Sequence, residues 1–284
     1  MIKINVKNFP DVNFRNWLLE QDYAKDGVLT DEIIADVTEM NVSMCSINSL
    51  KGIEYFTALT KLDCSWNYLT SLDVSHNPAL RVLSCNANDL ACLDLSHNSE
   101  LTELDCSCNP MVRFDVSNNP KLVKLNCSNI NSLALDLLIN LRHISPLALD
   151  LSHNHALKVL DCSANMMTTL DLSHNTKLRV LDCSSNELTS LDLSHNPALV
   201  KINCCWNSIT SLDLSCNPAL AILDCYDYNQ GCKAATDMLI ANLPHTDSGI
   251  IFASSGYNRE KVMAAKAKGW EIHEGPQAVA GIYN

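Results

Sequence analysis

Apolar residues in the middle of the chain recur with one fixed spacing. Eight cysteines mark it: Cys64, Cys85, Cys106, Cys127, Cys162, Cys183, Cys204 and Cys225. The intervals between them are 21, 21, 21, 35, 21, 21 and 21 residues. The repeated unit, L-x-x-L-x-C-x-x-N-x-L-x-x-L-D-L-S-x-N-x-x, is written most fully by residues 178–198. Such a period is typical of a solenoid, in which each unit buries its apolar side against its neighbours.

Within one unit, apolar residues occupy alternate places in two short stretches. The first runs from Leu178 to Cys183, and the second runs from Leu188 to Leu193 after a turn at Asn186. Alternation of this kind is the period of a half-buried strand, so two short extended segments are predicted in each coil. Successive coils should stack about 4.8 Å apart. The predicted fold is an α/β solenoid of mostly β coils, with parallel strands on one face.

The period begins and ends inside the chain, which predicts two end pieces. Residues 1–36 should form a helical N-terminal cap, with one helix from Pro10 to Gln21 and another near Asp31–Val37. Residues 37–230 should form the solenoid. A 35-residue unit at 122–156 lacks the first strand of its second part, and we expect it to bulge on the side away from the first strands.

The last segment, residues 231–284, should form an α/β C-terminal cap. The pattern predicts a helix over 233–243, a strand over 249–254, a helix over 258–268 and a strand over 270–273. Such a cap is needed because the last coil of a solenoid exposes unpaired strand edges and core.

Between the two N-terminal helices, residues 22–33 imitate a calcium-binding loop, with Gly27 at the sixth place. However, Ala24 stands at the third place, and Ile33 stands at the twelfth, where calcium loops carry a bidentate glutamate. With two ligands missing, a tight turn between two helices is the favoured interpretation.

Composition excludes several classes of partner. The net charge is −12 and the pI is near 5.1, so no basic patch is available to neutralise nucleic acid or an anionic membrane surface. No run of 18 or more apolar residues occurs, so no membrane span is expected. The first residues lack the apolar core of a signal peptide. A cytoplasmic location follows if Met1 is the native start.

Fourteen cysteines would ordinarily indicate disulfides. The eight in the repeat, however, hold one inward position, where neighbouring Cβ atoms stand about a coil apart and not at the roughly 3.8 Å of a disulfide. A reduced ladder of thiols is therefore predicted. Cys106–Cys108 and Cys204–Cys205 lack the spacing of zinc pairs, so no metal site or cofactor is expected.

The repeat resembles the leucine-rich repeat superfamily, and in particular a bacterial 21-residue class sometimes called IRREKO-type. The resemblance covers about residues 37–228, in eight near-copies. Both ends are similar to those of multi-repeat proteins from host-associated anaerobic bacteria, where a FPDxNFRxxLLxQDxxKDGxLT segment precedes the repeats. The resemblance implies protein recognition or adhesion in place of catalysis, and an extracellular or cell-surface location. The irregular unit, the altered calcium-like loop and the absent export signal depart from that pattern.

Stacking places identical residues in ladders. One ladder of asparagines should bond turn backbone, because a buried amide without partners is costly: Asn67, Asn88, Asn109, Asn165, Asn186 and Asn207. The aspartates of the D-x-S-x-N turns should do the same. Histidines in these turns could share a metal ion or respond to pH, but repetition of a tolerated surface residue is the favoured explanation, because no carboxylate completes a ligand set: His76, His97, His153, His174 and His195.

Another ladder is an acidic stripe on the first strand, interrupted by serine and asparagine: Asp63, Asp105, Asp161, Asp182 and Asp224. Stacked carboxylates repel one another, so this stripe favours a cationic partner or bound cations. Duplication of a solvated residue along with the repeat is the alternative. No nucleophile elbow, phosphate-binding glycine loop or H-E-x-x-H pair occurs, so no enzyme is predicted.

The favoured function is a non-enzymatic, monomeric binding module that recognises a protein, or less favourably a glycan, through the exposed strand face. The alternatives are a self-associating structural or surface repeat and an ion-responsive scaffold. Binding energy concentrates in aromatic or arginine anchors. The predicted contact residues are therefore the following: Trp66, Asp182, Lys201, Trp206, Asp224 and Tyr226.

Overall fold

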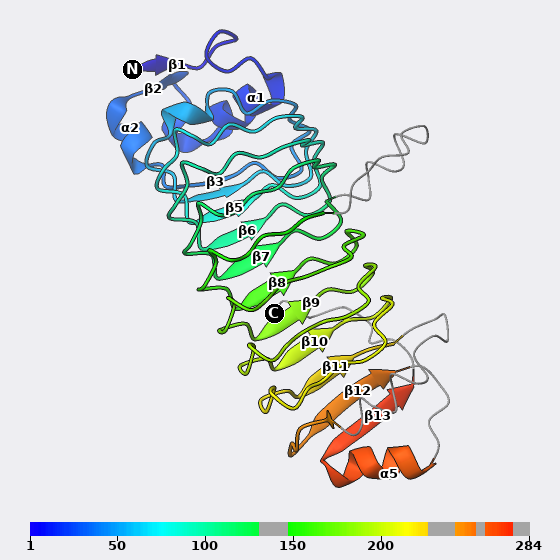
Figure 1. Cartoon of the computed structure of the whole chain (residues 1–284). Coiled ribbons are helices and arrows are strands. Elements are labelled where there is room, and N and C mark those ends of the chain that lie inside the picture. The colour runs from blue at the N-terminus through cyan, green and yellow to red at the C-terminus, as the bar shows by residue number, and fades with distance from the viewer. Residues whose placement is uncertain (131–146, 227–241, 254–258, 275–284) are drawn as a thin grey trace, which may run out of the picture. The chain divides into compact units, whose positions relative to one another are not determined.

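The computed structural model describes residues 1–130, 147–226, 242–253 and 259–274 (Figure 1). The chain falls into two compact units, Met1–Ala156 and Leu157–Asn284. Residues 131–146 lie outside the described part of the chain, and the predicted bulge of the 35-residue unit falls on them. The division into a helical cap, a solenoid and an α/β cap at residues 36 and 230 stays a prediction. None of the described helices has the length and apolar character needed to cross a bilayer.

The first unit opens with two short helices, α1 (Val12–Glu20) and α2 (Asp31–Asp36). Each begins at a capping side chain. The Asp11 carboxylate accepts two first-turn amide hydrogen bonds of 2.9 Å, and the Thr30 hydroxyl accepts one of 3.2 Å from Ile33. The two predicted helices are therefore confirmed, within one or two residues at their ends.

The calcium-like loop is a compact turn. It contains the 3-10 helix η1 (Asp22–Ala24), and its strand β2 (Val28–Leu29) pairs antiparallel with β1 (Ile2–Lys3). Gly27 has a φ of +70°, a region that favours glycine. The Lys25 ammonium lies 2.5 Å from the Asp22 carboxylate, so a cation of the chain itself contacts the first place of the loop. The turn predicted here is confirmed.

Five parallel strands follow in the first unit, one from each coil, and Figure 1 shows them in chain order. They are β3 (Glu39–Asn41), β4 (Lys61–Asp63), β5 (Val82–Ser84), β6 (Glu103–Asp105) and β7 (Lys124–Asn126). Each central residue aligns with the next, as Leu83 aligns with Leu104, and the central leucines are buried. The only other described helix of this region is η2 (Ile53–Tyr55), which belongs to the first coil.

The second unit repeats this arrangement in its described residues. Its strands are β8 (Val159–Asp161), β9 (Val180–Asp182), β10 (Lys201–Asn203), β11 (Ile222–Asp224), β12 (Gly249–Ala253) and β13 (Trp270–Glu274). The strands β12 and β13, with helix α5 (Arg259–Ala267), confirm three predicted C-terminal elements. The fourth, a helix over 233–243, falls mainly outside the described residues. Because β12 pairs parallel with β11, the edge of the last coil is covered by a continuing strand.

The second half of each coil was predicted to be a short extended segment. In the described coils no paired strand is assigned there. Leu188, Leu191 and Leu193 are buried as the alternation predicts, at 0%, 6% and 1% exposure. The amide of Leu188, however, donates to the side chain of Asn207 at 3.0 Å and not to a neighbouring strand. The apolar alternation thus reflects a buried segment without strand pairing.

The first asparagine ladder joins successive coils. Asn88 is typical: its Nδ2 donates to the carbonyl of Cys64 in the preceding coil (3.0 Å) and to that of Cys85 in its own (3.1 Å). Its Oδ1 accepts the amide of Leu69, also in the preceding coil, at 2.9 Å. One side chain therefore satisfies three buried backbone groups in two coils, and the predicted structural role is confirmed.

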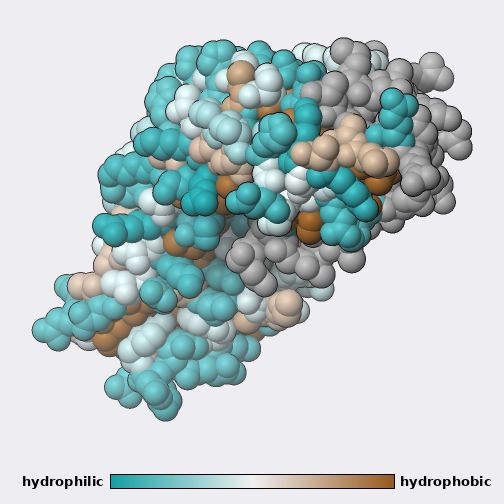
Figure 2. All heavy atoms as spheres, turned by 90° about the horizontal axis from the view of Figure 1, so that it is seen from below, coloured by the Kyte–Doolittle hydropathy of each residue, from teal (hydrophilic) through white to brown (hydrophobic). Residues whose placement is uncertain are grey.

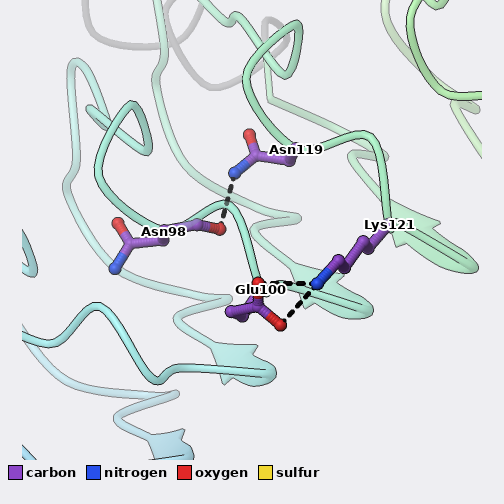
Figure 3. A network of polar contacts seen from close by, with 4 residues as sticks. All are labelled: Asn98, Glu100, Asn119 and Lys121. Atoms are coloured by element: carbon purple, nitrogen blue, oxygen red, sulfur yellow. Dashed lines mark hydrogen bonds and ion pairs between the residues drawn. The ribbon is translucent and has the colours of Figure 1, made fainter.

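A second ladder of buried asparagines stands in the D-x-S-x-N turns. Asn119 donates from Nδ2 to the carbonyl of Asn98 at 3.0 Å (Figure 3) and to that of Leu95 at 3.1 Å. Asn98 makes the equivalent pair of bonds to Val74 and Asn77, each at 3.0 Å. Both ends of the second half of each coil are therefore held to the preceding coil by amide side chains.

The repeat cysteines point into the core, and most are fully buried. The Cys106 thiol lies 3.6 Å from the carbonyl of Asn126 in the next coil, and the Cys162 thiol lies 3.5 Å from that of Asp182. Burial raises the pKa of the Cys64 thiol, which favours the protonated, hydrogen-bond-donating form. The described cysteines are free thiols, and the reduced state in solution stays a prediction.

Candidate functional site

The eighth place of the unit, just past each strand, has a left-handed backbone. Its φ lies between 52° and 57° at Met44, Trp66, Ala87, Cys108, Asn129, Ala164, Ser185 and Trp206. The amide there donates to the seventh residue of the next coil, as Trp66 does to Asn86 at 2.9 Å and Ala87 does to Ser107 at 3.0 Å. The stack of coils, and not the residue type, therefore imposes this conformation.

Two of these places carry tryptophan. Trp66 is 60% exposed and Trp206 is 45% exposed. A left-handed backbone costs a residue other than glycine roughly 1–2 kcal/mol, and bulky side chains are rare there. Since Ala87 and Ser185 occupy the same turn, the fold does not require tryptophan. A bulky, exposed side chain in a strained conformation is a signal of function.

The second unit brings two predicted contact residues together. The ring of Trp206 stands edge-on to that of Tyr226, with centroids 6.4 Å apart and planes at 63°. Lys201 lies on β10, in the same coil as Trp206, and is half-buried. Trp66 belongs to the first unit, where Met44 precedes it at the same place one coil earlier and is 73% exposed.

Sequence reasoning missed two exposed neighbours of Trp66. Met44 shares its place in the unit, and Tyr68, two residues on, is 57% exposed. The repeat itself contained the signal for Met44, because its unit starts at Val37 and Met44 is the eighth residue. Together these three form an aromatic and thioether patch on the first unit.

The predicted acidic stripe is not an exposed stripe. Asp161, Asp182 and Asp224 are 6%, 3% and 4% exposed, and Asp63 and Asp105 are half-buried. Alternation along the strand does turn these carboxylates away from the core. Each is nevertheless enclosed by the turn that follows, because the residue two places on donates its amide to the carboxylate.

Asp182 shows how such a carboxylate is held. Its Oδ1 accepts the Ser184 amide at 3.0 Å and the Ser184 hydroxyl at 2.6 Å, and its Oδ2 accepts Nδ2 of Asn203 at 2.8 Å. Burial, followed by the charge of Asp161, raises the pKa of this carboxyl. Asp182 and Asp224 are therefore buried and support the turn, and their predicted role as partner contacts stays a prediction.

Asp224 has an unusual donor. In other coils a serine at the seventh place bonds the acid two residues earlier, but Tyr226 stands at that place here. The thiol of Cys205, in the preceding coil, lies 2.6 Å from Asp224 Oδ1, and the Tyr226 amide lies 3.2 Å from it. Cys205 thereby replaces the missing serine, which leaves the seventh place open for an aromatic side chain next to Trp206.

The turn histidines are all exposed. In four of them the ring Nδ1 lies 3.0–3.1 Å from the preceding serine hydroxyl: His76, His97, His153 and His195. The described residues hold no group of three or more histidine, cysteine or acidic side chains that could bind a metal ion. The nearby turn aspartates are also structural, since bonds from Ser75 lower the pKa of Asp73.

On the face drawn in Figure 2, hydrophilic residues predominate and hydrophobic ones show as smaller areas between them. Large apolar or aromatic side chains that are exposed in the described residues include Trp66, Tyr68 and Trp206.

No family model matches the chain. Among curated proteins, it is similar to Internalin J of Listeria monocytogenes, at 37% identity over 86 residues, which are 27% of this chain and 9% of that protein. Among solved structures, an internalin, InlF, from the same organism aligns with a TM-score of 0.72 at 20% identity, covering 95% of this chain and 76% of that one. The chain has the fold of a bacterial leucine-rich repeat protein.

A second leucine-rich repeat structure, from Leptospira interrogans, aligns with a TM-score of 0.64 at 18% identity, over 85% of this chain and 62% of that one. These structural likenesses concern the fold. Because the matched segment is under a tenth of Internalin J, the activity and partners of that whole protein are not transferred.

The left-handed place of this leucine-rich repeat can be tested with one substitution at two sites. Ala87→Gly should raise the free energy of unfolding by about 1 kcal/mol, because glycine relieves the strain at φ 52°. Ala91→Gly is the control, since Ala91 is an exposed alanine of the same coil without a positive φ, and it should lower stability by roughly 0.5 kcal/mol or more. Urea unfolding measures both. Equal effects of the two substitutions would contradict the imposed conformation.

Asp182→Asn tests the burial of the acidic ladder. Asn126 shows that asparagine fits this place, since it accepts the Ser128 amide and hydroxyl at 3.1 and 2.8 Å. Because the folded-state pKa of Asp182 is raised, its ionisation opposes folding as the pH rises through that pKa. The stability of the variant relative to the parent should therefore increase from about pH 4 to about pH 7.

Asp94→Asn is the matched control with the opposite sign. Hydrogen bonds from Ser96 lower the pKa of Asp94, so its ionised form stabilises the fold at pH above the unfolded value and loses this contribution as the pH falls through the folded one. Relative to the parent, this variant should become less stable with rising pH. If urea titrations show that the stabilities of both variants, relative to the parent, change in the same direction with rising pH, the buried state assigned to Asp182 is wrong.

Proposed function

We propose that this chain is a non-enzymatic module that binds a protein partner through the exposed strand face of its second unit. The anchors are Trp206 and Tyr226, with Lys201 at the edge of the patch. Asp182 and Asp224 hold the turns beneath it. The observation that carries the proposal is the edge-on pair of Trp206 and Tyr226, 6.4 Å apart and standing on a turn that does not need either ring.

Three features support recognition as the role of this pair. Aromatic side chains concentrate binding energy, because they bury large areas and lose few rotatable bonds. The backbone below them is fixed by bonds between coils, such as Cys204 N to the Asp224 carbonyl at 2.8 Å, so the rings are presented on a preorganised surface. Tyr226 occupies the place where a serine usually bonds the acid, and the thiol of Cys205 contacts Asp224 in its stead, so the turn is kept with an aromatic side chain in it.

A protein is favoured over a glycan as the partner, and Trp66 with Met44 and Tyr68 offers a separate contact patch on the first unit. The likeness to internalins agrees with a protein-interaction role, and adhesion is one form that this role takes. Self-association is the competing function, because the exposed Trp206 and the half-buried Tyr226 would serve it equally.

The double variant Trp206→Ala/Tyr226→Ala should weaken binding by about 2 kcal/mol or more, roughly 30-fold, because both rings act as anchors. The parent and variant are used as paired baits. A protein that is captured by the parent alone is then purified and titrated by calorimetry against both. Val112→Ala is the control for loss of an exposed apolar side chain elsewhere, since Val112 is 74% exposed and lies outside the proposed contact residues, and circular dichroism verifies folding.

Two results would contradict the proposal. One is a purified partner that binds the folded double variant at the strength of the parent. The other is a parent that forms concentration-dependent oligomers in light scattering, with the oligomers abolished by the double variant, which would assign the rings to self-association.

A further inference from the structure

The second unit carries a row of cations on three consecutive coils, here called the basic stripe: Lys158, Arg179 and Lys201. Their backbones are directly linked, because the Arg179 amide donates to the Lys158 carbonyl at 2.8 Å and the Lys201 amide donates to the Arg179 carbonyl at 3.1 Å. Lys158 and Arg179 are exposed, and Lys201 is half-buried. The stripe runs along the strand face on the side where the strands begin.

Within the described residues, none of these three side chains has an ion-pair partner. The acids on the same strands do not compensate them at the surface, because Asp161 and Asp182 are 6% and 3% exposed. Asp182 is bonded within its own and the next coil, by Ser184 and Asn203. The burial that removes the predicted acidic stripe therefore leaves a positive surface on a chain of net charge −12.

Two lysines of the first unit have counter-charges within the chain. Lys121 lies 2.6 Å from both oxygens of Glu100 (Figure 3), and Lys124 lies 3.4 Å from Glu103. The hydrogen bond and the charge of Lys121, followed by the charge of Arg81, lower the pKa of Glu100. Lys121 and Lys124 thus have their counter-charges inside the chain.

Arg81 and Lys124 stand at the same places in the unit as Arg179 and Lys201. Glu100 stands 19 residues after Arg81, and 19 residues after Arg179 the chain has Ala198. Glu103 stands 21 residues before Lys124, and 21 residues before Lys201 the chain has Val180. The second unit therefore keeps the cations of this motif and lacks its glutamates.

We propose that the basic stripe binds carboxylates of an acidic segment in the protein partner that the aromatic pair anchors. This inference rests on the proposed function and specifies the chemistry of its partner. Arginine suits the role because its planar guanidinium matches a carboxylate with two parallel hydrogen bonds. The partner supplies the counter-charges that Ala198 and Val180 do not.

An acidic peptide fits this stripe better than a nucleic acid does. A nucleic acid carries a dense line of phosphates, and its binding needs many neutralising cations. The chain has 32 acidic residues against 20 lysines and arginines, so a long polyanion is repelled beyond the stripe. A short peptide with a few carboxylates can contact the basic stripe without extending over the acidic surface beyond it. Its other side chains can contact Trp206 and Tyr226.

The test uses two double variants of the full chain that remove the same charges from matched places. One is Arg179→Gln/Lys201→Gln, and its control is Arg81→Gln/Lys124→Gln. The probe is a fluorescein-labelled peptide that alternates glutamate with valine and tyrosine, and its comparison peptide has glutamine for each glutamate. Fluorescence anisotropy at low and moderate salt measures the affinity of each peptide, and circular dichroism verifies that each variant is folded.

The parent should bind the glutamate peptide saturably, and added salt should weaken this binding. Arg179→Gln/Lys201→Gln should weaken it about tenfold or more, since two charge contacts are lost, whereas the control should change it less than about twofold. Equal losses in the two variants, equal binding of the glutamine peptide, or no saturable binding by the parent would overturn the inference. Tighter binding of single-stranded DNA than of the glutamate peptide would also overturn it.

These outcomes separate the inference from the proposed function. A purified partner that loses affinity with Trp206→Ala/Tyr226→Ala but not with Arg179→Gln/Lys201→Gln would leave the aromatic anchors in place and refute the acidic segment. A partner that loses affinity with neither double variant refutes both.

Discussion

The fold depends on amide side chains that join one coil to the next. Only about three residues of each coil form a strand, and the strand ladder cannot satisfy the backbone of the remaining turns. Buried amides without partners are costly, so the second half of the coil needs another source of bonds. Asn88 and its equivalents supply it at one end and Asn98 and its equivalents at the other. Leucines and thiols then fill the space that these bonds enclose.

That constraint also decides where function can arise. The turn past each strand is fixed in a left-handed conformation by bonds between coils, whichever residue occupies it. The acid before it is buried by the same turn. Side chains beyond these places are free to vary, and the variation is what distinguishes one part of the face from another. Trp206, Tyr226 and the absence of glutamates beside the basic stripe distinguish the second unit on a scaffold that tolerates these changes.

Much of the fold follows from spacing alone, because a 21-residue period with one cysteine and one asparagine per unit allows few arrangements. The place of Trp206 beside Tyr226 was also predictable, since stacking sets their register. The burial of Asp182 was not, because alternation gives the direction of a side chain but not the turn that folds over it through Ser184. The lack of strand pairing in the second half was unpredictable for a similar reason. Alternation of leucines indicates burial, whereas the hydrogen-bond partner of the Leu188 amide, Asn207, lies in another coil.

The measurement that tests the central constraint most directly is the stability of the full chain with Asn88→Ala, followed by urea unfolding. Three buried backbone groups in two coils lose their partner, so the free energy of unfolding should fall by about 3 kcal/mol or more. Asp89→Ala removes the exposed neighbour and should change it by less than about 0.5 kcal/mol. If the two variants unfold at the same urea concentration as the parent, the asparagine amides do not hold the coils together.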